Sequence, residues 1–310
     1  MDILMPYLLL ILAAMFWGGN YVVGHILVAQ ADPIIMTEAR WLLTAILLGF
    51  LYFNQVKNNL NKIRNCFIAI IFLSVFGQVL FPLTLYIGLQ TTTSLNAAIY
   101  MSATPGIVLI INGVIFRDKI TLNNILGVIL STFGVFFLVM KGNVSDTRVF
   151  HHINTGDLWA MGSALSWAFY CSFLRLKDKT IPSNAFVTVS SLTGAVILIP
   201  IVWYYTTQFP ISLSSYTHGS FLAGLLYLVL FLSWLSYVFW NKGIGEIGAT
   251  RGEIYTHIIP LSGGVFSIVF LDVQLKSYHI VSALLIGVGI WFCSKKLKPK
   301  STLASPLEHK

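Results

Sequence analysis

Long apolar runs separated by short polar segments dominate the sequence, and ten such runs can be counted. Each is apolar on every face for roughly 20 residues, the length that a helix needs to span a bilayer. Strands of a membrane barrel would instead alternate over segments of about ten residues. The pattern predicts an all-α integral membrane protein with ten transmembrane helices. The expected helices cover about residues 4–25, 34–53, 66–88, 94–116, 122–140, 156–175, 185–205, 219–241, 249–271 and 278–294.

The second half of the chain repeats a pattern found in the first half. Residues 88–119 run from a glycine through a polar turn and an apolar run to a charged end, and residues 243–272 repeat this order. At the offset of 155 residues that separates Gly88 from Gly243, Pro105 matches Pro260. We interpret the pattern as an internal duplication. Because each copy holds an odd number of helices, the second copy is expected to be inverted, as two inverted five-helix repeats (5+5).

The distribution of basic residues predicts the orientation of the chain. Cytoplasmic segments hold more Lys and Arg than external loops, and this bias places both the N- and the C-terminus in the cytoplasm. The external loops then hold only Lys141, Arg148 and Lys276. The cytoplasmic set is Lys57, Lys62, Arg64, Arg117, Lys119, Arg175, Lys177, Lys179, Lys242, Lys295, Lys296, Lys298, Lys300 and Lys310.

These features divide the chain into two repeats and two polar segments. The expected units are a first repeat at residues 4–140 (helices 1–5), an outside linker at 141–155, a second repeat at 156–294 (helices 6–10) and a basic cytoplasmic tail at 295–310.

Composition excludes several classes of protein. Of the 310 residues, 56% are hydrophobic and 10% are charged, whereas a soluble domain carries about 25% charged residues. The net charge of +8 follows the orientation signal and indicates no nucleic-acid partner. The three cysteines show no ligand spacing, and His151 and His152 fit a solvated loop better than a metal site. No catalytic set stands out, so we expect no metal, no cofactor and no enzymatic activity.

Polar and aromatic side chains within the apolar runs are the candidates for a binding site. An amide in hydrocarbon must find a partner, a neighbouring helix or a wet cavity. Such residues fall on helices 1, 3, 4, 6, 8 and 9, and Trp167 and Tyr170 repeat the spacing of Trp17 and Asn20. For each aromatic residue alone, ordinary helix packing stays as good an interpretation. The expected cavity wall comprises Trp17, Asn20, Gln78, Asn96, Tyr100, Trp167, Tyr170, Tyr237, Tyr255 and His257.

His257 is the titratable side chain expected deepest in the membrane, tyrosines aside. It lies about halfway along the ninth run, before Pro260. Its ordinary pKa of about 6.5 suits proton exchange, so it is a candidate for substrate binding or for possible proton coupling. A hydrogen-bonded packing role is the alternative. Glu38 and Glu253 are expected near the ends of their spans, and the role of Arg40 stays open.

The motifs resemble those of the EamA family in the drug/metabolite transporter superfamily. The resemblance rests on FWGGNYVVG at residues 16–24, Arg40-Trp41 after Pro33, GLQTTTSLNAAIYMSATP at 88–105 and IGATRGEIYTHIIPLSGGVFSIVFLD at 247–272. It covers roughly residues 5–295. It implies ten helices in two inverted repeats, cytoplasmic termini, and transport of amino acids, other metabolites or xenobiotics, often outward.

The sequence therefore predicts a secondary transporter, in the exporting direction, of small metabolites such as amino acids or related amphipathic solutes. It would work by alternating access around a midplane cavity, as a monomer in the lipid bilayer of a bacterial inner membrane. The alternative is a flippase for lipids or lipid-linked sugars, and a membrane enzyme is the third and weakest interpretation.

Overall fold

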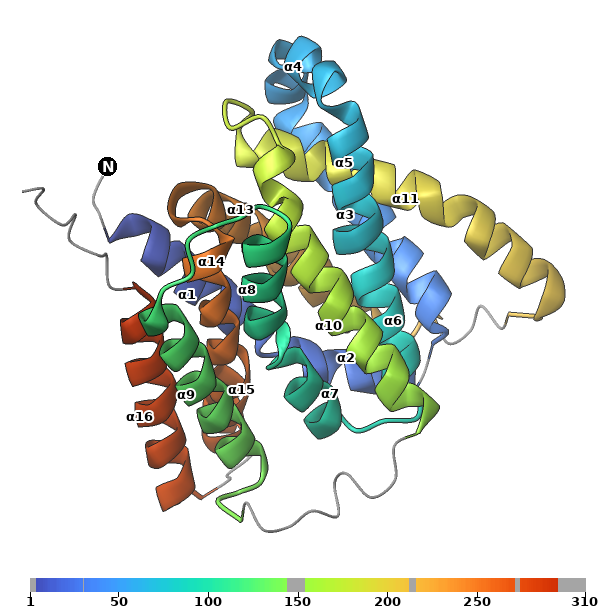
Figure 1. Cartoon of the computed structure of the whole chain (residues 1–310). Coiled ribbons are helices and arrows are strands. Elements are labelled where there is room, and N and C mark those ends of the chain that lie inside the picture. Colours follow the sequence, from blue (N-terminus) through green and yellow to red (C-terminus); the bar gives the residue numbers. More distant parts are fainter. Residues whose placement is uncertain (1–3, 30, 144–153, 212–215, 271–273, 295–310) are drawn as a thin grey trace, which may run out of the picture.

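The computed structural model describes residues 4–29, 31–143, 154–211, 216–270 and 274–294, and these residues form helices joined by short turns (Figure 1). The prediction of an all-helical protein is confirmed, because no strand occurs within these ranges. Most of the expected linker, at 144–153, and the expected tail, at 295–310, lie outside the described residues.

The helices of the first half follow the expected runs, several in broken form. They are α1 (Met5–Trp17), α2 (Asn20–Val28), α3 (Pro33–Asn58), α4 (Leu60–Asn65), α5 (Phe67–Ser74), η1 (Val75–Leu80), α6 (Phe81–Leu89), α7 (Ser94–Met101), α8 (Thr104–Val114) and α9 (Leu122–Val139).

The second half shows a similar succession of long and broken helices. They are α10 (Thr155–Phe173), η3 (Leu174–Leu176), α11 (Ser183–Gln208), α12 (Gly219–Tyr227), η5 (Leu228–Leu235), α13 (Ser236–Ile247), α14 (Ala249–Gly252), η6 (Glu253–His257), α15 (Ile258–Phe270) and α16 (Ser277–Ser294).

Polar residues at helix starts satisfy backbone groups that the apolar runs cannot. The side chain of Asp32 accepts a hydrogen bond from the backbone N–H of Ile34 at 2.8 Å at the start of α3. Thr121 and Asn154 form reciprocal capping boxes at the starts of α9 and α10. Such caps stabilise helix ends by about 1 kcal/mol each.

The break between α1 and α2 lies at Gly18 and Gly19, where other helices come close. A Cβ on Gly18 would lie 2.0 Å from the hydroxyl of Ser262, and one on Gly19 would lie 2.3 Å from that of Tyr227. The Tyr227 hydroxyl donates a hydrogen bond to the backbone oxygen of Phe16 at 2.7 Å. The glycine pair therefore lies at the break and leaves space for Tyr227, whose hydroxyl pairs with the backbone oxygen of Phe16.

The two halves are interrupted at corresponding places. The third and eighth expected runs each contain a π-helical segment, η1 and η5. The fourth run is interrupted between α7 and α8, and the ninth run contains the 3-10 segment η6. Such segments leave carbonyl groups unpaired within the helix and often mark functional sites.

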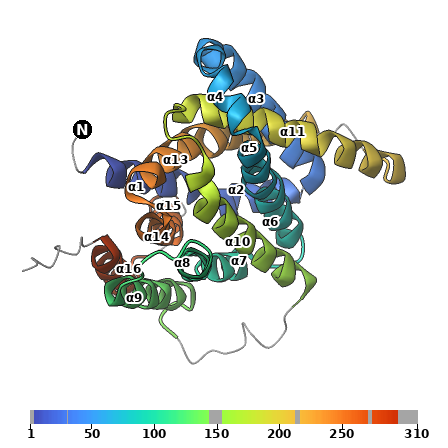
Figure 2. The same ribbon diagram turned by 45° about the horizontal axis from the view of Figure 1, so that its top comes forward.

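Helix packing between the halves has a matching pattern. The most extensive contacts join α9 to α16 and α3 to α11, which lie at opposite edges of the bundle in Figure 2. Between these edges, α10 packs against η1 and α6 and against α7 and α8, while α1 packs against η5 and α13 and against η6 and α15. Each helix contact named here has a counterpart when the two halves are exchanged. For example, the contact of α10 with α6 corresponds to that of α1 with α13.

Seven helical spans among the described residues are long and apolar enough to cross a membrane. The expected first and ninth runs are not among these spans, because breaks divide their helices. The sixth run, α10, is also absent, because its many Gly and Ser residues make it less apolar. The count of ten membrane crossings stays a prediction. The seven spans are Pro33–Asn58, Phe67–Leu89, Ser94–Val114, Leu122–Val139, Ser183–Gln208, Gly219–Ile247 and Ser277–Ser294.

The start of α1 and the end of α16 lie on one side of the bundle, at the upper left of Figure 1. Tyr255 joins them, because its ring centroid lies 6.0 Å from that of Tyr7 and its hydroxyl lies 3.0 Å from that of Ser294. We refer to this side as the terminal side. The end of α13 lies there too, since a Cβ on Gly243 would lie 3.0 Å from the backbone oxygen of Pro6.

The contact between α9 and α16 depends on glycines, which allow backbones to approach closely. A Cβ on Gly289 would lie 2.6 Å from the backbone oxygen of Gly127, whereas the position of a Cβ on Gly287 is open. We predict that Gly289→Val destabilises the protein by about 1–3 kcal/mol through overpacking. Gly287→Val, on the same helix, is the matched control.

Thermal unfolding of both purified variants in detergent checks this prediction. A clear fall in the unfolding midpoint for Gly289→Val alone is expected. Equal midpoints for the two variants would show that the close α9–α16 contact does not form.

Candidate functional site

Buried aromatic residues from both halves meet in the centre of the bundle. Trp17 on α1 lies with its ring centroid 5.0 Å from that of Trp167 on α10, in an edge-to-face arrangement. Trp167 stacks on Tyr170 at 5.1 Å, and Trp17 lies 5.7 Å from Tyr237 on α13. Such pairs are each worth about 0.5–1.5 kcal/mol beyond their burial. The aromatic cluster comprises Trp17, Trp41, Phe81, Trp167, Tyr170, Tyr237 and Trp240.

The π-helical segments supply acceptors to this cluster. The indole N–H of Trp17 donates to the backbone oxygen of Leu232 in η5 at 3.1 Å, and the hydroxyl of Tyr237 donates to that of Gly77 in η1 at 2.6 Å. Gly77 and Leu232 are related by the 155-residue offset of the repeat. The same irregularity in both halves therefore satisfies the polar atoms of the buried rings.

A tyrosine–asparagine pair occurs once in each half, with the residue types exchanged. In the first half, the hydroxyl of Tyr86 on α6 donates to Oδ1 of Asn20 on α2 at 3.1 Å. In the second half, Tyr170 on α10 donates to Oδ1 of Asn241 on α13 at 2.7 Å. Tyr170 follows Trp167 at the spacing at which Asn20 follows Trp17. Asn241 lies 155 residues after Tyr86, the offset of the repeat.

Arg40 is the buried charge of the first half. Its side chain is 1% exposed; Nε donates to Oγ of Ser233 at 2.5 Å and Nη1 donates to the hydroxyl of Tyr86 at 2.7 Å. Within the described part of the chain, no carboxylate forms a salt bridge with it. The guanidinium is therefore held by neutral acceptors, and it connects α3, α6 and η5. We refer to Asn20, Arg40, Tyr86 and Ser233 as the Arg40 network.

Glu253 is buried among the helices, which its expected place near the end of a span did not predict. Its side chain is 1% exposed, and Oε1 accepts a hydrogen bond from the indole N–H of Trp167 at 3.0 Å. Its Oε2 is buried with no hydrogen-bond partner in the described structure. Gly248, at a φ of +80°, ends α13, and the short segments α14 and η6 that follow carry Glu253. Glu253 is thus, like His257, a buried titratable group.

His257 uses both of its ring nitrogens in hydrogen bonds. Nε2 lies 2.9 Å from the backbone oxygen of Ser102, and Nδ1 lies 2.7 Å from Oγ of Ser131 on α9. Because a carbonyl oxygen only accepts, Nε2 carries the hydrogen, and Nδ1 is free to accept from the serine hydroxyl. The cavity beside the ring holds only about 10 Å³. A neutral histidine satisfies this arrangement, which joins η6 to the break between α7 and α8.

The remaining expected residues are divided between the cluster and other places. Gln78, on η1, donates to Oγ of Ser190 at 3.4 Å. Asn96 lies near the start of α7, where its Nδ2 donates to Asp157 at 3.3 Å. Tyr100 is half-buried further along α7, and Tyr255 lies at the terminal side. The structure therefore gathers Trp17, Trp167, Tyr170 and Tyr237. Asn20 lies beside them through Tyr86, and Gln78 lies in η1, next to the Gly77 carbonyl that accepts from Tyr237. The structure leaves Asn96, Tyr100, Tyr255 and His257 elsewhere.

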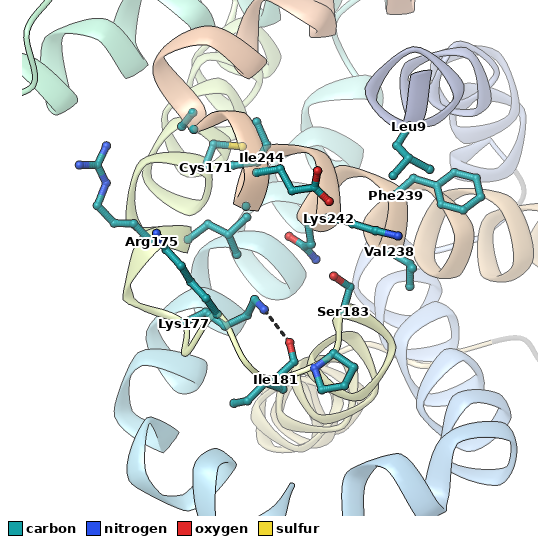
Figure 3. Close-up of a pocket in the computed structure, with 18 of the residues that line it drawn as sticks. Leu9, Cys171, Arg175, Lys177, Ile181, Ser183, Val238, Phe239, Lys242 and Ile244 are labelled. Atoms are coloured by element: carbon teal, nitrogen blue, oxygen red, sulfur yellow. Dashed lines mark hydrogen bonds between the residues drawn. The ribbon is translucent and has the colours of Figure 1, made fainter. Parts of the chain in front are cut away.

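A cavity of about 960 Å³ opens at the terminal side of the bundle, between α1, α10, α11, α13 and α14 (Figure 3). Leu9, Val238 and Phe239 form an apolar wall on one side. The inner part includes two residues that are each 1% exposed, Cys171 and Asn241. These contact the aromatic cluster, because Trp240 donates to the Cys171 sulfur at 3.3 Å and Tyr170 donates to Asn241. None of the ten expected site residues lines this cavity.

Basic side chains surround the mouth of the cavity. They are Arg175, Lys177, Lys179 and Lys242, and Glu246 is the one acidic residue among those that line the cavity. The ammonium of Lys177 donates to the backbone oxygen of Ile181 at 3.0 Å, as the dashed line in Figure 3 marks. Burial lowers the pKa of Lys177, and the neighbouring carboxylate of Asp178 opposes this change.

One ion pair beside the mouth links the two halves. Arg175 donates to both carboxylate oxygens of Asp118, at 3.0 and 2.7 Å, and its guanidinium lies 4.1 Å from the ring centroid of Phe116. These hydrogen bonds lower the pKa of the Asp118 carboxyl. Both side chains are about one-third exposed, so the pair contributes little stability, but it connects the α8–α9 turn to the end of α10.

Several residues of the site were missed or left open by the sequence interpretation: Arg40, Tyr86, Asn241 and Glu253. A charge inside an apolar run is a functional candidate by default, and that signal was available for Arg40 and Glu253. Tyr86 and Asn241 carried a weaker signal, because only the duplication offset relates them.

The Arg40 network yields a stability prediction. Tyr86→Phe removes the acceptor of a buried guanidinium hydrogen bond and the donor to Asn20, so we expect a loss of about 1–3 kcal/mol in unfolding free energy. Tyr52→Phe on α3 is the matched control, because its hydroxyl forms no hydrogen bond with a described residue. Chemical unfolding of the purified variants measures both values, and equal effects would contradict the network.

Comparisons with known proteins give the family. The model of the EamA-like transporter family matches residues 4–140 and 154–295. A Bacillus subtilis protein named "Uncharacterized transporter YyaM" is 28% identical over 291 residues, covering 92% of each chain. A Salmonella typhimurium protein named "Uncharacterized inner membrane transporter YicL" is 24% identical, over 89% of this chain and 90% of its own.

A solved crystal structure shares the fold. Its chain superimposes with a TM-score of 0.70 at 11% sequence identity, covering 93% of this chain and 96% of that one. The similarity inferred from the sequence motifs is confirmed by the family model and the relatives. This chain belongs to the EamA-like transporter family.

Proposed function

We propose that this protein is a secondary transporter that exports small solutes across a bacterial inner membrane. The two repeats, at residues 4–140 and 156–294, would each contribute five spans and rock against each other to give alternating access. Membership of a transporter family and the names of the relatives support transport through a membrane. The solute, the direction and the mechanism are our inference from the site.

The packing supports an inverted arrangement of the repeats. The helix contacts are preserved when the two halves are exchanged, as expected of two halves related by a pseudo-twofold axis. Residues that contact their own counterparts lie close to such an axis. Ser102 and His257 are counterparts at the 155-residue offset, and they are joined by the hydrogen bond from Nε2 of His257 to the Ser102 carbonyl. Two copies with an odd number of spans, related by an axis in the membrane plane, have opposite orientations.

The observation that carries the proposal is a cavity open on one side and ended by packed rings. The 960 Å³ space reaches Cys171 and Asn241, and the aromatic cluster lies directly behind them. The basic residues at its mouth are on the side that the charge bias assigns to the cytoplasm. The structure would then represent an inward-open state, ready to receive a solute from the cytoplasm.

The walls of the cavity suit solutes with a polar and an apolar part. Leu9, Val238 and Phe239 offer apolar contacts, while Asn241 and the basic residues offer donors. Ligand pockets commonly combine a mostly apolar lining with a few placed polar groups. Amino acids and related amphipathic metabolites or xenobiotics have this character, and the cavity volume accommodates them.

Blocking the cavity should stop transport without unfolding the protein. Gly245 lines the cavity, and a Cβ there would meet no atom within 4 Å. We predict that Gly245→Trp reduces solute flux at least about tenfold, because an indole would occupy the solute's path. Gly287→Trp on α16, where a Cβ also meets open space, is the matched control and should leave flux unchanged.

Counterflow of radiolabelled amino acids and organic acids in reconstituted vesicles, with and without a pH gradient, provides the measurement. Flux that is equal in the two variants would contradict the assigned cavity. Movement of a fluorescent phospholipid between leaflets, with no solute flux, would instead identify a flippase.

A further inference from the structure

We propose that the cavity recognises its solute through a carboxylate group, with the side-chain amide of Asn241 as the donor at its inner end. The ligand class is therefore amphipathic carboxylates. The inference rests on the proposed function, because the cavity proposed to carry the solute is the one proposed here to bind its carboxylate. Three features of the cavity support it: an unused donor, an excess of positive charge and an apolar wall.

Asn241 is a buried donor without an acceptor. Its side chain is 1% exposed and lines the cavity. Its Oδ1 accepts the hydroxyl hydrogen of Tyr170 at 2.7 Å, whereas its Nδ2 donates to no residue in the described structure. A buried donor left unpaired costs free energy until an acceptor arrives. Because Tyr170 occupies the acceptor atom, the N–H groups are what the amide has left to give to an oxygen acceptor on a solute.

The charges around the mouth favour an anion. Arg175 is already engaged by Asp118. Lys177 gives one hydrogen bond to Ile181, which leaves two of the three donors of its ammonium. Lys242, the next residue after Asn241, is exposed. Glu246 is the single carboxylate among the lining residues, and Asp178 lies beside Lys177. Lys179 and Lys242 then leave an excess of basic groups, which favours anionic solutes.

The apolar wall completes the recognition. Figure 3 shows Leu9, Val238 and Phe239 on one side of the cavity and Arg175 and Lys177 on the other. A solute with a carboxylate at Asn241 and an aryl or alkyl group against Leu9, Val238 and Phe239 matches this lining. A neutral amide of the same shape would lose the charge interaction, and an amine would be repelled.

A matched series of probes tests this inference. The probes are 3-phenylpropanoate, 3-phenylpropanamide and 3-phenylpropylamine, titrated at pH 7 against the purified full-length protein by calorimetry. We expect the carboxylate to bind at least about tenfold more tightly than either analogue, because it alone gains charge-assisted hydrogen bonds. Failure of the carboxylate to bind, or equal binding by the amide or the amine, would overturn the inference.

Two variants and one control locate the binding group. Asn241→Asp keeps the acceptor for Tyr170 and removes the donor, so carboxylate affinity should fall at least about tenfold. Lys242→Gln changes an exposed residue, is expected to fold normally, and should weaken binding severalfold and reduce its dependence on salt. Lys57→Gln, which removes an exposed charge on α3 away from the cavity, should have no effect. Unchanged carboxylate preference in both cavity variants would refute the assignment.

The test separates this inference from the proposed function. Carboxylate-selective binding that both cavity variants lose, without flux in vesicles, would leave the inference standing and remove the transporter. Flux of other solutes, without carboxylate preference, would leave the transporter standing and remove the inference.

Discussion

Polar atoms buried among apolar helices must find partners within the protein, and this constraint shapes the centre of the structure. In hydrocarbon no water is present to replace a missing partner. The indole of Trp17 and the hydroxyl of Tyr237 are satisfied by backbone oxygens of the π-helical segments, at Leu232 and Gly77. The irregular helices and the aromatic cluster therefore depend on each other, and together they form a packed barrier between the two sides of the bundle.

The duplication gives this barrier two related flanks. On one flank, Asn241 lies at the inner end of the cavity and accepts a hydrogen bond from Tyr170 behind it. On the other, their counterparts Asn20 and Tyr86 are tied to Arg40. In an alternating-access cycle, the Arg40 network would be the group that separates when the opposite side opens. The exchange of residue types between the halves makes the two flanks chemically different.

The sequence was sufficient to predict the helical class and much of the cluster. Apolar length identified the helical runs, and the repeated spacing of Trp17 and Trp167 pointed to residues that do meet. It was insufficient where position along a run had to stand for burial. Glu253 lies only a few residues from the start of its run, yet its side chain is buried. The cavity itself depends on how α13 lies against α1 and α11, which no periodicity within one helix reveals.

The most direct test of this account measures access to the cavity from each side of the membrane. In a background with Cys66→Ser, Cys171→Ala and Cys293→Ala, single cysteines replace Lys242 at the cavity and Lys276 before α16. A membrane-impermeant maleimide is then added to intact cells and to inside-out vesicles. The account predicts labelling of Lys276→Cys in cells and of Lys242→Cys only in inside-out vesicles. Labelling of both positions from the same side would contradict it.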